Sequence, residues 1–177
     1  MNEIEKIASR DNQRLVNARK VRDGRGDGQI FVEGKRLALE ALRSGLAIDE
    51  CFFVSGAVDD ELIHVARAAA GATFELSQKL FDTIADTKTP QGIILIAKRP
   101  ANGRETIEQR LQAGEATLPL LLFLKEINNP ANLGAIMRTA EAAGVAGVIV
   151  STAAADVHSA KAVRAAMGAS FRMPVWD

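Results

Sequence analysis

The stretch NNPANLGAIMRTAEAAG, residues 128–144, decides the fold of the second half of the chain. It follows PLLLFL (119–124), a continuous apolar run that predicts a parallel strand covered on both faces. The stretch itself predicts a loop and then a helix over 132–143, with Pro130 fixing a backbone angle and Asn132 capping the helix. Gly134 allows a ligand or another chain segment to approach closely. Since ligands bind beyond the carboxyl ends of strands in open α/β sheets, we expect a site at 128–134.

Arg138 is the first candidate site residue. Counting 100° per residue, it lies about 140° from the centre of the helix's apolar stripe, so it leaves the helix away from the core. That stripe consists of Leu133, Ile136, Met137 and Ala140. A long cation near the ligand-binding end of a sheet suits a phosphate or a ribose. The alternative is that Asn132 is only a cap and Arg138 only pairs with Glu141 at i+3. Neither GxxxxGK[ST] nor GxGxxG is present, which argues against nucleoside triphosphates and dinucleotides.

The rest of the chain alternates strands and helices. After residue 117 the pattern predicts a βαβαβ unit (118–177), with a strand at 147–151, a helix at 159–167 and a third strand at 170–175. Residues 1–99 predict an α/β/α sandwich, and Pro100 with Asn102–Gly103 marks a linker over 100–117. In that first part we expect helices at 14–21, capped by Ser9 or Asp11, 36–43, 59–70 and 78–84, and strands at 30–33, 51–55, 73–76 and 92–98.

Composition gives the compartment and a first indication of the partner. The 177 residues carry no net charge and a single cysteine, Cys51, so neither an intrachain disulfide nor a cysteine-rich metal site can form. Without a signal-peptide core or an apolar run of roughly 20 residues, cytoplasm is the expected compartment and a membrane is not an expected partner. Residues 10–25 hold six basic and two acidic side chains, whereas 44–86 hold two basic and eight acidic. Such a dipolar surface can orient the protein on a polyanion, or can be only a solvated face. The candidate RNA contacts are Arg10, Arg14, Arg22, Lys35 and Arg36.

The 128–144 stretch resembles the first motif of the SpoU-type RNA methyltransferases, which belong to the knotted SPOUT superfamily. The shared pattern is Asn-Pro-x-Asn-x-Gly-Ala-Ile-x-Arg-Thr-Ala, and the run Lys161–Val175 resembles that family's next segment. SRDN near the start, with FVEGKRLALEAL further on, is similar to the substrate-binding domain often fused ahead of the SpoU domain, itself similar to a small RNA-binding ribosomal protein. Asn129 stands where the family often has an acidic residue.

The resemblance implies methyl transfer from S-adenosylmethionine to a ribose 2′-hydroxyl of ribosomal or transfer RNA. It implies catalytic roles for Arg138 and Asn132 and a homodimer in the complete enzyme. No metal is expected, because His64 and His158 have no third ligand nearby. Because guanidinium stays protonated, we expect Arg138 to hold the adjacent phosphate and polarise the hydroxyl rather than act as a free base.

The family's later motifs, with Gly-Glu-Gly and Ser-Leu-Asn character, do not follow in the printed sequence. Those segments form the knot and line the cofactor pocket. We therefore expect 118–177 to be the first part of a SpoU domain, with no cofactor-binding residues of its own and no tight cofactor binding. Three functions remain open: an RNA 2′-O-methyltransferase represented by its first part, a non-catalytic RNA-binding module, and an unrelated α/β ligand-binding protein.

Overall fold

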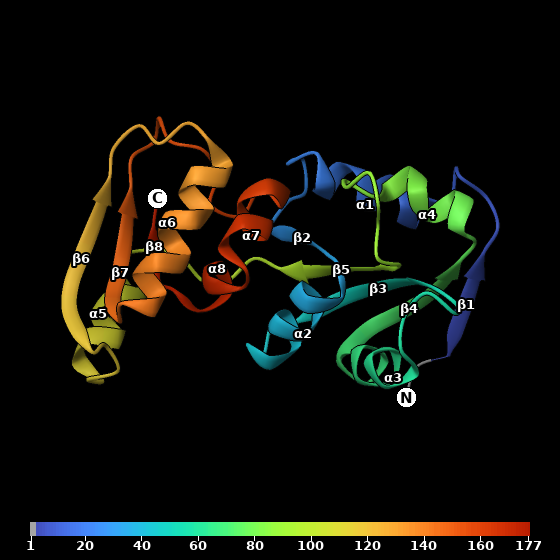
Figure 1. The fold of residues 1–177 in the computed structure, drawn as a ribbon, viewed down its shortest axis with the longest axis horizontal. Helices are drawn as coiled ribbons and strands as arrows, with labels where there is room; N and C mark the ends of the chain where they lie inside the picture. The colour runs from blue at the N-terminus through green and yellow to red at the C-terminus, as the bar shows by residue number, and fades with distance from the viewer. Residues whose placement is uncertain (1–2) are drawn as a thin grey trace. The chain divides into compact units, whose positions relative to one another are not determined.

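In the computed structural model, which describes residues 3–177, the chain divides after Arg99 into two units (Figure 1). A five-stranded sheet of order β1-β4-β3-β5-β2 organises the first unit. β1, β4 and β3 run parallel, whereas β5 is antiparallel to both β3 and β2. Its elements are β1 (Ile4–Ile7), α1 (Gln13–Arg22), β2 (Gln29–Glu33), α2 (Lys35–Arg43), β3 (Ile48–Val54), α3 (Asp60–Ala69), β4 (Ala70–Leu76), α4 (Gln78–Ile84) and β5 (Ile93–Lys98).

Helices cover both faces of this sheet, as the alternating pattern predicts. α1 and α4 pack together on one face, and α2 and α3 pack together on the other (Figure 1). The core between the layers is aromatic and aliphatic: Phe52 and Phe74 stack with ring centroids 5.2 Å apart, and Ile93 to Ala97 of β5 are all fully buried. The first unit is therefore an α/β/α sandwich.

One strand of this unit was not predicted, and one predicted helix cap is wrong. Ile4–Ile7, which has no strong apolar alternation, forms strand β1 because β4 offers it a parallel partner over four residues. The cap of α1 is Asn12, whose side chain accepts a hydrogen bond from the Arg14 N–H at 2.8 Å, and neither Ser9 nor Asp11 takes that role. The Ser9 hydroxyl instead accepts from the Asp11 N–H in the preceding turn.

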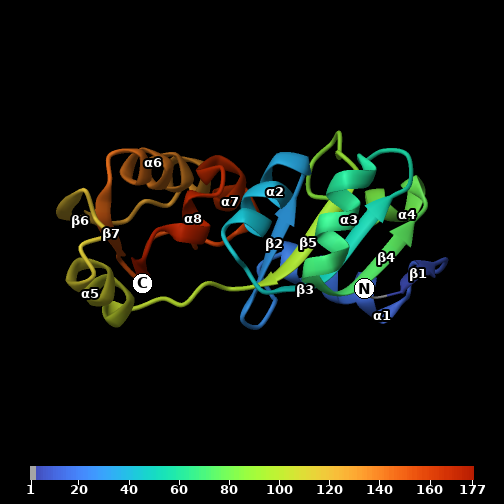
Figure 2. The ribbon, with the colours of Figure 1, turned by 90° about the horizontal axis from the view of Figure 1, so that it is seen from below.

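The second unit contains a three-stranded parallel sheet of order β6-β7-β8. α6 and α5 lie on opposite sides of these strands (Figure 2). An added Cβ on Gly147 of β7 would lie 2.9 Å from Ile107 Cγ1 of α5, so that helix packs directly on the sheet. α5 lies within the stretch predicted as a linker, where the sequence also predicts a short polar helix at 105–113. The elements are α5 (Arg104–Gln112), β6 (Leu118–Leu124), α6 (Pro130–Ala142), β7 (Val145–Val150), α7 (Ala160–Ala166), α8 (Ala169–Arg172) and β8 (Val175–Trp176).

The strand predicted at 170–175 is wrong for most of its length. Met167 and Gly168 adopt positive φ (53° and 94°), which ends α7, and the chain then forms the short helix α8. Ala169 and Met173 are four residues apart and both are buried in the same core cluster, which is helical spacing. Strand structure begins only at Val175, where β8 pairs with β7 through two residues.

Strand β6 does not have the environment that its apolar run predicts. It lies at the edge of the sheet and pairs with β7 on one side. Its side chains are largely exposed, with Leu120 at 56% and Phe123 at 65%, and only Leu124 is buried. Both faces of β6 are therefore partly open in the described part of the chain. The apolar run predicts that the strand is covered, but it does not show which segment or which chain covers it. No helix in the described part of the chain is long and apolar enough to cross a membrane.

Candidate functional site

The loop at the carboxyl end of β6 is tied to the loop that follows β7. The Ser151 hydroxyl accepts a hydrogen bond from the Glu126 N–H at 2.9 Å, and the Ala155 N–H donates to the Ile127 carbonyl at the same distance. Glu126 has a φ of 54°, which is unusual for a residue with a side chain. Strained backbone of this kind clusters at binding sites. The sequence predicted a site at this loop, but it did not single out Glu126 or Ser151. Ser151 could have been found, because it directly follows β7, a strand parallel to β6.

Asn129, rather than Asn132, caps α6. The Asn129 side chain accepts from the Ala131 N–H at 2.9 Å, and Pro130 occupies the first turn, where its missing N–H costs nothing. The predicted helix start was therefore two residues late, and the capping role given to Asn132 is wrong. Asn132 is exposed in the first turn of the helix, so its amide is available to a ligand.

Gly134 accounts for how closely two helices pack. A Cβ at this position would lie 2.3 Å from the Ala162 carbonyl oxygen and 2.8 Å from Ala165 Cβ, both on α7. No side chain fits there, so glycine is required for α7 to cross α6. Of the two roles that the sequence left open for Gly134, the structure supports close approach of another chain segment.

Arg138 projects from α6 with its side chain exposed, and the structure records no ion pair or side-chain hydrogen bond for its guanidinium within residues 3–177. Most of the predicted apolar stripe is buried: Leu133 and Met137 are fully inaccessible, Ala140 is 2% exposed, and Ile136 is partly buried. Glu141, the partner that would have neutralised Arg138, is instead bound by Arg172. The alternative in which Arg138 serves only a Glu141 pair is therefore wrong for this structure.

Asn132 and Arg138 do not converge on one point. Six residues separate them, which places them about 9 Å apart along the helix axis and about 120° apart around it. Arg138 is also about 12 Å along the axis from the start of the helix, counting eight residues from Pro130. This separation does not suit a compact catalytic pair that acts on one small molecule. An extended polyanion can contact both Asn132 and Arg138.

The five predicted RNA contacts are divided between the two faces of the first unit. Arg10 precedes α1, and Arg14 and Arg22 lie on α1, whereas Lys35 and Arg36 lie on α2 across the sheet. One flat ligand surface cannot include all five.

Several of these cations already have partners. Arg14 forms an ion pair with Glu50 at 2.6 Å, Arg22 pairs with Asp23 at 2.8 Å, and Lys35 approaches Asp59 at 3.5 Å. Burial raises the pKa of the Glu50 carboxyl, and the hydrogen bond from Arg14 opposes that rise. The Arg22 hydrogen bond lowers the pKa of Asp23. These arginines therefore contribute to the fold as well as to the surface charge.

Each half of the chain matches a known protein family. Residues 4–95 match the MRM3-like substrate binding domain, and residues 119–177 match the SpoU rRNA Methylase family. The human mitochondrial rRNA methyltransferase 3 is 33% identical over 162 residues, which are 91% of this chain and 37% of that protein. The 23S rRNA (guanosine(2553)-2′-O)-methyltransferase of Bacillus subtilis is 29% identical over 97% of this chain and 64% of its own length.

The fold is similar to that of a solved rRNA methyltransferase. The AdoMet-bound rRNA methyltransferase from Sinorhizobium meliloti superposes with a TM-score of 0.76 and 26% identity, over 98% of this chain and 64% of that one. The chain thus spans between roughly a third and two thirds of the length of these relatives. Because both units match the same class of protein, the third possibility, an unrelated α/β ligand-binding protein, is excluded. The chain therefore belongs among proteins with an MRM3-like substrate binding domain, and this domain is followed by a segment of the SpoU rRNA Methylase family.

Proposed function

We propose that this chain serves 2′-O-methylation of ribose in ribosomal RNA, and that it supplies the surface on which the target nucleotide is held. The observation that carries the proposal is the exposed Arg138 guanidinium on α6, free of Glu141 because Arg172 binds that carboxylate. The relatives named as rRNA methyltransferases support the substrate class. The match of residues 4–95 to a substrate binding domain supports RNA as the partner.

The chemistry assigned to Arg138 follows from its permanent charge. Guanidinium does not give up its proton in proteins, so it cannot remove the proton of the ribose hydroxyl as a free base. It can hold the phosphate next to the target ribose through two parallel N–H donors and polarise the hydroxyl as negative charge develops on its oxygen. Asn132, about 1.7 turns earlier on the helix, orders the neighbouring part of the bound RNA in this proposal.

S-adenosylmethionine is the proposed methyl donor, by relationship to an enzyme solved with AdoMet bound. Two clefts beside the helices of the second unit do not fit it. The cleft beside α6, about 440 Å³, offers Thr139 as its one polar side chain and no charged one, although the donor carries a carboxylate, an ammonium and a sulfonium. The cleft beside α5 is about 220 Å³, below the roughly 300 Å³ of most ligand pockets, and its Arg104 and Glu108 already pair with each other.

The same misfit favours a second function, a non-catalytic RNA-binding module. In this alternative the first unit docks RNA and α6 adds a further contact, with no methyl transfer. Both functions require RNA binding, and they separate on whether methyl groups are incorporated.

We also propose a homodimer for the complete enzyme and the cytoplasm as its compartment. The dimer is supported by the apolar surface of β6, where Leu120 and Phe123 are more than half exposed. The compartment is supported by the single, buried and unpaired Cys51, since a chain built for an oxidising compartment commonly relies on disulfides.

A methyl-incorporation assay tests the proposal. Protein expressed from the full reading frame is incubated with ribosomal RNA and tritiated S-adenosylmethionine. Arg138→Ala should lower turnover by about a hundredfold or more, as loss of one group that stabilises developing negative charge does, and should leave donor binding unchanged. Lys161→Ala, which removes an exposed cation from the neighbouring helix α7, should retain wild-type turnover. Wild-type turnover in Arg138→Ala would end the role assigned to Arg138, and absence of incorporation by the wild type would favour the binding module.

A further inference from the structure

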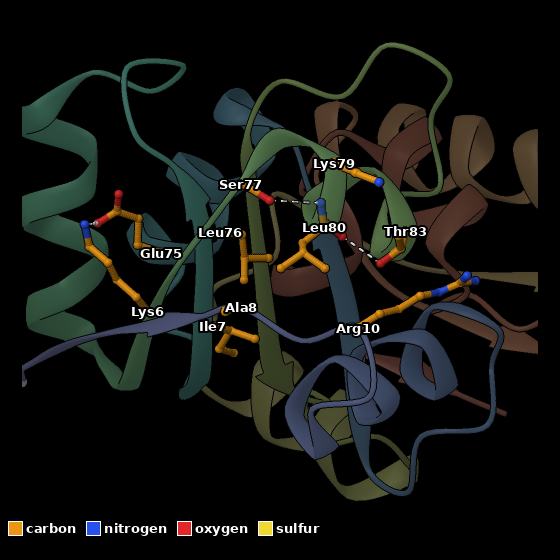
Figure 3. A pocket seen from close by; sticks show the side chains of 10 residues that line it. All are labelled: Lys6, Ile7, Ala8, Arg10, Glu75, Leu76, Ser77, Lys79, Leu80 and Thr83. Carbon is orange, nitrogen blue, oxygen red and sulfur yellow. Dashed lines mark hydrogen bonds and ion pairs between the residues drawn. The ribbon is translucent and has the colours of Figure 1, made fainter.

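A cleft of about 800 Å³ opens in the first unit where β1 and β4 end together (Figure 3). The two strands are parallel, and Ile7 and Leu76 form their last paired position. Both strands therefore present their carboxyl ends to the cleft, and α4 begins at its wall. The volume is within the range of roughly 300–1,000 Å³ that ligand sites occupy.

The lining combines an apolar floor with cations at its ends. Ile7, Leu76 and Leu80 lie between the two ends in Figure 3. At one end Lys6 pairs with Glu75 at 3.5 Å. At the other end Arg10 and Lys79 lie near Thr83 (Figure 3), and the structure records no ion pair or side-chain hydrogen bond for either cationic group within residues 3–177.

Neighbouring arginines hold this end of the cleft in shape. One guanidinium nitrogen of Arg19 donates to the Arg10 backbone carbonyl at 3.0 Å, and the other donates to the Thr83 hydroxyl at 3.5 Å. Arg22 donates to the carbonyls of Thr83 and Ala85 at 3.4 and 3.2 Å. These contacts fix the loop that carries Arg10 against α4, so Arg10 and Lys79 are the cations left available.

The charge around the cleft favours a polyanion. α1 carries four basic side chains, Arg14, Arg19, Lys20 and Arg22, and no acidic one. On the opposite face of the sheet, α3 begins with Asp60 and Glu61. A polyanion is therefore drawn to the face formed by α1 and α4, the side to which Arg10 and Lys79 belong.

We propose that this cleft binds an unpaired nucleotide of the substrate RNA, with its base against Ile7, Leu76 and Leu80 and the flanking phosphates on Arg10 and Lys79. The inference rests on the proposed function, because it takes RNA as the partner. A base needs an apolar surface and must be unstacked to reach it, so single-stranded RNA satisfies the cleft, whereas a continuous duplex leaves the apolar floor uncovered. An acidic peptide would satisfy the cations but gives no planar apolar group for the floor.

The first experiment measures binding of the full chain to a fluorescein-labelled single-stranded RNA of about 12 nucleotides, the size that small single-strand sites cover. R10A/K79A should bind about tenfold more weakly than wild type at low salt. The slope of log affinity against log salt should fall by about 1.4 for two lost phosphate contacts. The matched control R43A/K98A removes two exposed cations of the same unit outside the cleft and should change affinity less than twofold. Equal losses in the two variants would overturn the proposal.

A second pair of variants tests the base contact separately from charge. Leu80→Ser should weaken binding of the RNA about fivefold while leaving binding of inorganic polyphosphate unchanged, and Val65→Ser on α3 should alter neither. Equal weakening of RNA and polyphosphate binding would overturn the base contact, as would competition by polyglutamate as effective as that by RNA. Circular dichroism of each variant checks folding. If the wild-type chain binds RNA but the cleft variants bind as well as it does, the cleft assignment alone fails. If the wild type binds no RNA at low salt, the proposed function fails with it.

Discussion

The Arg172 guanidinium donates to the Glu141 carboxylate through Nε at 2.6 Å and Nη2 at 3.2 Å, which joins α8 to α6. Glu141 lies three residues after Arg138 on α6, within the reach of an i,i+3 ion pair. By binding Glu141, Arg172 keeps that carboxylate from Arg138, which in the proposed function leaves Arg138 available to RNA. It acts as a positioning residue, because it works through Glu141.

Removing Arg172 should transfer Glu141 to Arg138. An i,i+3 pair contributes about 0.2–0.5 kcal/mol, so Arg172→Ala should weaken the Arg138-dependent part of RNA binding about twofold. The double variant E141Q/R172A should recover wild-type affinity, since the competing charge is gone. Fluorescence anisotropy with labelled RNA gives both affinities. A double variant as weak as the single one would show that Arg172 contacts RNA itself.

Gly134→Ala should destabilise the second unit. Alanine normally favours a helix interior over glycine by about 1 kcal/mol, yet here its methyl group would lie 2.3 Å from the Ala162 carbonyl oxygen. Forcing α6 and α7 apart should reverse the sign and cost about 1–3 kcal/mol in free energy of unfolding. Urea unfolding followed by circular dichroism measures it, with Ala142→Ser on the exposed side of α6 as the control. A more stable Gly134→Ala protein would contradict the packing role.

Arg14→Ala should destabilise the first unit in a pH-dependent way. Burial raises the pKa of Glu50 in the folded chain above that in the unfolded chain, so ionised Glu50 costs stability as pH rises through its folded pKa. Arg14 offsets part of that cost through its 2.6 Å ion pair. Its loss should lower the free energy of unfolding by about 1–3 kcal/mol at pH 7, with a smaller loss at pH 4, where more of the Glu50 carboxyl is protonated.

Urea titrations of wild type and Arg14→Ala at the two pH values provide the comparison. Arg43→Ala, whose partner Glu40 is 3.6 Å away and whose own side chain is 72% exposed, should be nearly neutral at both. An Arg14→Ala loss that is independent of pH would rule out the Glu50 pair as its cause.

Replacing exposed apolar side chains of β6 should reduce self-association. An edge strand that is paired on one side only, with Leu120 and Phe123 exposed, is a template for pairing with another chain. L120K/F123K should shift the chain toward monomer in sedimentation velocity at micromolar concentration without lowering its helix content. V65K, at an exposed valine of α3, is the matched control and should leave the distribution unchanged. A monomeric wild type at high concentration would remove the support that β6 gives to the proposed dimer.

The sequence predicted a helix or strand well where its end residues and its apolar pattern indicate the same element. α4 has the predicted bounds because Ser77 caps it and accepts from the Leu80 N–H, and the parallel pairing of β6 and β7 follows from two apolar runs joined by a helix. The 170–175 prediction failed because Phe171 and Val175 are residue types common in strands, although Phe171 lies in the short helix α8 and only Val175 lies in a strand.

The candidate site was harder to predict because it depends on relations that spacing alone does not contain. Arg172 lies 31 residues from Glu141, so only the fold shows that it displaces Arg138 as the partner. The same holds for Arg14 and Glu50, 36 residues apart, and for the cleft that joins Arg10 to Lys79. A charge count over 10–25 predicts a basic face, but it cannot show which of those cations the fold already uses.

Photo-cross-linking of the chain to ribosomal RNA, followed by mass spectrometry of the modified peptides, tests most directly whether this protein holds RNA through the surfaces assigned to it. Cross-links are expected on peptides that contain Arg10 or Lys79 and on the α6 peptide around Arg138. Their yield should fall as salt rises from about 50 to 200 mM, because phosphate contacts carry the affinity. Cross-links concentrated on α2 and α3, or the absence of any on the first unit, would contradict the account.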